Sequence, residues 1–144
     1  MGKKRIISKG ETAGGEAGNA ASPVKSSKRK VESGVLFVRA SYNNTTLSLA
    51  DEKGNVIGFS SSGALGFQGA KKGTPFAAAK VGETLGAKAQ TFGMKEASVV
   101  VSGVGSGRES AIRGFMSKGI TLKTIRDVTP VPFNGPRPKK PRRV

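Results

Sequence analysis

The sequence predicts an α/β domain with a mixed, five-stranded sheet covered by helices, and three observations support this. Strand-like and helix-like hydrophobic patterns follow one another in the order β-β-β-α-β-α-β between residues 33 and 130. Short turns separate the first three strand patterns, as in an antiparallel meander. Each helix pattern then lies between two strand patterns, which favours right-handed parallel crossovers.

The first three strands are predicted from alternating apolar residues. The pattern from Val35 to Tyr42 places every second side chain on one face, namely Leu36, Val38, Ala40 and Tyr42. Residues 46–50 point Leu47 and Leu49 inward, and residues 56–59 form the third strand. The turn-forming segments Asn43-Asn44 and 51–55 separate them.

The second half predicts two helices and two strands. Thr74 and Pro75 are typical of a helix start, and Gly93 of its end. One apolar stripe runs between them, formed by Ala78, Val81, Leu85, Ala89 and Phe92. The mainly apolar run 97–101 (ASVVV) predicts a strand buried on both faces.

A second helix is expected from the capping-box spacing of Ser106 and Glu109. Its buried face is expected to consist of Ile112, Phe115 and Met116. Gly119 ends this helix, and residues 120–128 form the last strand.

Positive charge is concentrated at the two ends of the chain. Its 144 residues include 25 Lys+Arg and 9 Asp+Glu, a net charge of +16, of which residues 1–30 carry +6 and residues 136–144 carry +5. We therefore expect a basic, disordered N-terminal extension (1–32), a globular core (33–130) and an extended, proline-rich basic C-terminal arm (131–144). Such tails suit a nucleic-acid partner better than a solubilising role or a membrane surface.

The composition excludes several classes of protein. The chain has no His and no Cys, so serine–histidine or cysteine–histidine catalysis and thiolate metal sites are excluded. No apolar stretch reaches 18 residues. We expect a soluble cytoplasmic protein that is not an enzyme, needs no cofactor or metal and does not bind a membrane.

Three segments are candidate contacts, and each has a structural alternative. The glycine-rich loop 62–73 carries Lys71 and Lys72 beside Phe67, a ring for base stacking or, with equal weight, a core residue. Residues 103–110 (GVGSGRES) suit phosphate binding with Arg108, or a tight turn. Asn43-Asn44 suits RNA edges or its own turn, and Asn134-Gly135 is a hypothetical deamidation site.

Five motifs, in order, resemble the bacterial type of small-subunit ribosomal protein eleven: Ala40–Thr45, Gly66–Gly69, Lys72–Ala78, Gly107–Ser110 and Asp127–Pro138. The resemblance covers about residues 33–144 and implies a ribonuclease H-like fold. Two departures stand out. Val104 and Ser106 replace prolines that family members commonly have, and Phe133 stands where His is common.

The resemblance implies a structural component of the small-subunit platform that binds ribosomal RNA directly. It would lie near the messenger RNA exit path and the Shine–Dalgarno site, with neighbouring platform proteins and messenger RNA as further partners, and would not form homo-oligomers. The positions that match RNA-facing family segments are Asn43, Asn44, Lys71, Lys72, Arg108, Asn134, Gly135, Arg137, Lys139, Lys140, Arg142 and Arg143.

Two other functions are less consistent with the sequence. A metal-dependent nuclease would need several converging carboxylates, and none lies in the first strand of the sequence pattern. A free RNA chaperone or DNA-compacting protein would share the basic tails but would not need five ordered motifs on a compact core.

Overall fold

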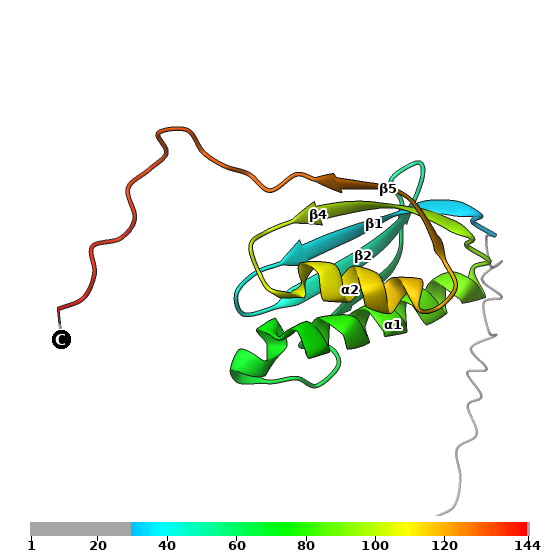
Figure 1. Ribbon diagram of the computed structural model, residues 1–144, viewed down its shortest axis with the longest axis horizontal. Helices are drawn as coiled ribbons and strands as arrows, with labels where there is room; N and C mark the ends of the chain where they lie inside the picture. Colours follow the sequence, from blue (N-terminus) through cyan, green and yellow to red (C-terminus); the bar gives the residue numbers. More distant parts are fainter. Residues whose placement is uncertain (1–29, 144) are drawn as a thin grey trace, which may run out of the picture.

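The computed structural model describes residues 30–143, in which two helices pack against a five-stranded sheet (Figure 1). Along the chain these are β1 (Ser33–Ala40), β2 (Thr45–Asp51), β3 (Val56–Ser61), the 3₁₀ turn η1 (Gly69–Gly73), α1 (Pro75–Thr91), β4 (Glu96–Ser102), α2 (Gly107–Met116) and β5 (Thr121–Asp127). The expected extension lies outside the described residues up to position 29, as does Val144.

The strands lie in the order β3-β2-β1-β4-β5. β2 pairs antiparallel with both β1 and β3, whereas β4 pairs parallel with β1 and β5. Tight turns can only reverse the chain, and a helix crossover is needed to return it in the same direction. The predicted mixed, five-stranded sheet is therefore confirmed.

Both helices lie on the same face of the sheet, and the main core fills the space between the two layers (Figure 1). Leu36, Leu47, Leu49 and Val99 point into this core and are fully buried. The prediction that residues 97–101 are buried on both faces is wrong. Burial alternates along β4, because neither α1 nor α2 covers the other face of the sheet.

Helix α1 forms as the sequence predicts. The Thr74 hydroxyl accepts a hydrogen bond from the Ala77 N–H at 3.4 Å, and Pro75 occupies the first turn. Four stripe residues are fully buried: Ala78, Val81, Leu85 and Ala89. Gly93 follows the helix with φ of +79°, a conformation that glycine adopts without steric cost.

Glycines bring α1 and α2 close together. A methyl group on Gly82 of α1 would overlap the Ala111 carbonyl oxygen of α2, and one on Gly114 of α2 would overlap the Ala79 carbonyl oxygen of α1. The two backbones therefore meet without intervening side chains. This contact fixes the position of α2, which is only 10 residues long.

Helix α2 begins where expected but is not capped as predicted. The Ser106 hydroxyl makes no capping hydrogen bond and donates instead to the Gly73 carbonyl at 2.9 Å. The predicted buried face is wrong for Met116, which is 45% exposed. Phe115 is buried as expected, Ile112 is partly buried, and Ala111 and Gly114 complete the inward face.

Candidate nucleic-acid interface

One end of the sheet gathers the predicted site residues that lie outside the C-terminal arm. We call it the loop end: residues 41–44, 62–73 and 103–106, beside the ends of β1, β3 and β4. Both helices begin there, since α1 follows residues 62–73 and α2 follows residues 103–106 (Figure 1). Helix N-termini carry partial positive charge, so both helix dipoles favour an anion at this end.

Glycines hold the loop-end segments against the β1–β2 turn. A methyl group on Gly73 would overlap the Tyr42 carbonyl oxygen, and one on Gly105 would overlap the Ser41 carbonyl oxygen. The Gly105 N–H donates to the Ala40 carbonyl at 3.0 Å. These contacts give the loop end a fixed shape.

Arg108 joins the loop end to the start of the C-terminal arm. Its guanidinium donates to the Gly103 carbonyl, to the Thr129 hydroxyl at 3.2 Å and to the Asp127 carboxylate. Hydrogen bonds from the Thr129 hydroxyl and N–H, followed by the one from Arg108, lower the pKa of Asp127 to about 2. This cluster sets the direction in which the chain leaves β5.

The C-terminal arm runs away from the core (Figure 1). Five exposed cations lie along it: Arg137, Lys139, Lys140, Arg142 and Arg143. Asn134 has φ of +55°, an uncommon value for a residue with a side chain, and Gly135 approaches the Pro132 ring closely. The two form a bend that redirects the arm.

The remaining predicted contact residues lie at the loop end. Lys71 is exposed and Lys72 is half-buried in η1, and neither forms an ion pair within residues 30–143. Asn43 is exposed at the β1–β2 turn. The Asn44 backbone N–H donates to the Ser41 hydroxyl at 3.1 Å, and its side-chain Oδ1 is buried without a partner among these residues.

The aromatic side chains differ from the sequence expectation. Phe67 is half-buried and makes an edge-to-face contact with Phe76, with the ring centroids 6.1 Å apart. Phe76 and Tyr42 are the exposed rings here, Tyr42 by 78%. No separate role was predicted for Phe76. Its position outside the apolar stripe of α1 was the signal that its ring is exposed.

Tyr42 borders a groove of about 320 Å³ that was not predicted. Arg39, Val104 and Pro130 also line it, so it lies between the β1–β2 turn, the β4–α2 loop and the exit of β5. The sequence pattern predicts Tyr42 as part of the first strand, on one face with Leu36, Val38 and Ala40. That is wrong, because β1 ends at Ala40 and Tyr42 belongs to the turn.

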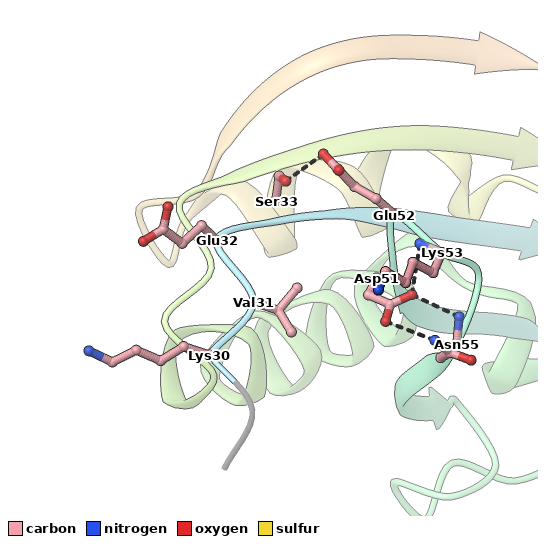
Figure 2. Close-up of a pocket in the computed structure, with 8 residues that line it drawn as sticks. All are labelled: Lys30, Val31, Glu32, Ser33, Asp51, Glu52, Lys53 and Asn55. Atoms are coloured by element: carbon pink, nitrogen blue, oxygen red, sulfur yellow. Dashed lines mark hydrogen bonds between the residues drawn. The ribbon is translucent and has the colours of Figure 1, made fainter. Parts of the chain in front are cut away.

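The opposite end of the sheet carries acids and lysines together, with Lys30, Lys53 and Lys95 beside the acids. Glu32, Asp51, Glu52 and Glu96 lie around the starts of β1 and β4 and the β2–β3 turn. In the hollow of about 730 Å³ drawn in Figure 2, the Ser33 hydroxyl donates to Glu52. Asp51 accepts hydrogen bonds from Lys53 and Asn55, those from Asn55 being the main cause of its lowered pKa. Asp51 thus stabilises the β2–β3 turn.

The described residues carry no group of three or more acids that could hold a metal ion. In the same part of the chain, no helix is both long and apolar enough to cross a membrane. At the start of these residues, the Val31 N–H donates to Phe92 and the Glu32 carbonyl accepts from Lys95 and Glu96. The chain thus contacts the core before β1 begins.

Comparison with known proteins identifies the family. The profile of the ribosomal protein S11 family matches residues 34–143. The chain is 49% identical over 129 residues to the small ribosomal subunit protein uS11 of Solibacter usitatus, covering 90% of this chain and 96% of the relative. The chain therefore belongs to the ribosomal protein S11 family, the structural proteins of the small ribosomal subunit that its five motifs resemble.

Proposed function

We propose that this protein binds the ribosomal RNA of the small subunit directly, through its loop end and its C-terminal arm. The charge partition carries this proposal. The loop end and the arm carry exposed cations and both helix N-termini and contain no acid, whereas acids and lysines are mixed at the opposite end. An RNA backbone is therefore attracted to the first end more strongly than to the second.

The two parts of the interface have different tasks. The loop end presents a preformed surface, since glycine contacts fix its segments and Arg108 ties it to the exit of β5. The arm supplies charge without a fixed shape and neutralises phosphates along its length. Arg108, predicted as an RNA contact, then also acts as a positioning residue for the arm.

We also propose the finer placement implied by family resemblance. The protein lies in the platform near the messenger RNA exit path and the Shine–Dalgarno site, beside other platform proteins. The strand order β3-β2-β1-β4-β5 with two helices supports the ribonuclease H-like assignment of the fold. Crosslinking residues 62–73 and 134–144 within intact subunits tests the placement. Crosslinks confined to RNA remote from the platform would refute it.

Salt dependence tests the direct RNA contact. With about eight phosphates contacted, affinity for purified small-subunit ribosomal RNA should fall about 10³–10⁵-fold between about 50 and about 200 mM salt. A chain ending at Gly135 lacks the five arm cations. The slope of log affinity against log salt should then decrease by up to about 4.

Lysines at the opposite end provide the matched control. Lys88 and Lys95 are exposed there, at the end of α1 and the start of β4. Replacing both with Gln removes charge remote from the proposed contact, so the slope should stay as in the natural chain. A slope that changes in the control and not in the truncated chain would show that RNA binds the end of the sheet opposite the loop end. That result would refute the proposed contact.

A further inference from the structure

The face of the sheet opposite the helices has no cover within residues 30–143. Register places one continuous row of side chains across all five strands on this face: Arg126, Val100, Phe37, Ser48 and Phe59. Phe37 is 42% exposed and Phe59 is 56% exposed. We call these five residues the open row. Half-exposed rings on an uncovered sheet are typical of an interaction surface.

The neighbouring rows show how apolar and polar groups are distributed. Arg39, Thr46 and Ser61 lie beside the open row toward the loop end, and Val35 lies beside it on the other side. Arg39 and Arg126 are the cations of these rows, and neither forms an ion pair with a described residue. The surface therefore has an apolar centre, with Arg39 toward the loop end and Arg126 at the β5 edge.

We propose that the open row docks a second protein of the small subunit, through an apolar segment with a carboxylate beside it. Apolar side chains would pack on Phe37 and Phe59, over the small Ser48 between them. The carboxylate would pair with Arg39 or Arg126. RNA fits less well, because two cations among apolar and hydroxyl side chains neutralise few phosphates. The RNA-attracting cations lie on the loop end and the arm.

The size of the surface also indicates the kind of partner. Five strands at about 4.8 Å spacing and six residues at about 3.3 Å rise give a face of roughly 450 Å². A stable complex buries about 800 Å² on each partner. The contact is therefore too small to hold two free proteins together and suits a neighbour already held by the same RNA. A second copy is disfavoured, since each copy carries a net charge of +16.

Photo-crosslinking in intact subunits tests the occupant. The chain would carry p-benzoylphenylalanine at position 37 and, as a control, at the exposed helix position 87. We expect position 37 to crosslink to a peptide of another small-subunit protein. Crosslinks to RNA, to a second copy or to residues 1–29 of the same chain would overturn the proposal, as would the absence of any crosslink specific to position 37.

A double variant, Phe37→Ser with Phe59→Ser, tests the energetic role. A serine, Ser48, already occupies this face, and the two substitutions leave the core between sheet and helices unchanged. In competition with the natural chain, retention of the crosslinked neighbour in subunits should fall about tenfold. Circular dichroism and thermal unfolding of the variant would establish that it folds.

The variant should bind purified ribosomal RNA with natural affinity and salt slope, which separates this proposal from the RNA contact. Unchanged retention of every subunit protein would overturn the docking role and leave RNA binding intact. A loss of RNA affinity without loss of a neighbour would show instead that the open row contacts nucleic acid.

Discussion

Asp127 illustrates how a single residue couples the core to the arm. Its carboxylate accepts hydrogen bonds from Thr129 and Arg108, and its pKa is lowered from 3.8 to about 2. A carboxyl group whose pKa is lowered on folding stabilises the folded state at pH values above its unfolded pKa. This contribution is lost as the pH falls through the folded pKa. The stability of the arm junction is therefore sensitive to acid.

Replacing Asp127 with Asn should reveal this contribution. The free energy of unfolding should be lower in the variant above pH 3.8, and the difference should shrink as pH falls to about 2. Urea unfolding across this range measures it. Thr129→Val removes the largest cause of the shift and should lose much of the same acid-sensitive stability. Parallel curves for all three chains would contradict the assignment.

The two aromatic residues of the loop end should behave differently. Tyr42 is exposed beside the groove, so Tyr42→Ala should weaken binding to small-subunit ribosomal RNA by about tenfold or more if a base stacks on it. Tyr42→Phe keeps the ring and serves as control. Filter binding measures both, and equal affinity of the Ala variant and the natural chain would rule out stacking.

Phe67 instead belongs to the packing of the loop. Because it is half-buried against Phe76, Phe67→Ala should lower the free energy of unfolding by about 1 kcal/mol or more. Urea unfolding tests this. An RNA affinity reduced without any loss of stability would restore the stacking role that the sequence offered as an equal alternative.

At the scale of elements, the α1–α2 contact depends on the absence of side chains. Gly82→Ala would gain about 1 kcal/mol of helix propensity. The added methyl group would nevertheless overlap Ala111, and overpacking of this kind costs about 1–3 kcal/mol or more. We expect net destabilisation in urea unfolding.

Gly63 supplies the matched control for that substitution. Its nearest neighbour is the end of the Lys72 side chain, 3.8 Å from an added methyl group. Gly63→Ala should therefore change stability by less than about 0.5 kcal/mol. Equal effects at both glycines would show that the helices can separate without cost.

The elements themselves follow from local patterns, whereas their contacts do not. The Thr74 cap, the α1 stripe and Leu47 with Leu49 are determined by periodicity and turn chemistry, and the structure confirms them. The run of β4 was misread because its outward Val100 is as apolar as its inward neighbours, although the outward Ser98 was an available signal of the open face. Met116 was misplaced because glycines, not large side chains, form the helix contact.

The candidate site was predictable where charge alone defines it. The cations of the arm and of η1 are visible as sequence runs. The bonding of Arg108 was not, because its partners Asp127 and Thr129 follow 19 and 21 residues later in the chain. Tyr42 and Arg39 come together with Pro130 only through the fold.

At the scale of the whole molecule, the arm and the core should differ in their resistance to proteolysis. The arm is exposed and carries five trypsin sites, two of which precede proline, while the core is compact. Brief trypsin treatment of the free protein should cut the arm after Lys139 and Arg142 before it cuts the core. Small-subunit ribosomal RNA should slow this cleavage, as mass spectrometry can measure. Unslowed cleavage at saturating RNA would show that the arm makes no contact.

The concentration of cations in the C-terminal arm also has a kinetic consequence. Five cations and no acid follow Gly135, so the electrostatic potential around the arm is positive. A polyanion attracts such an arm most strongly within a Debye length, about 8 Å at physiological salt. The arm therefore draws RNA toward the protein before the loop end docks, which raises the association rate.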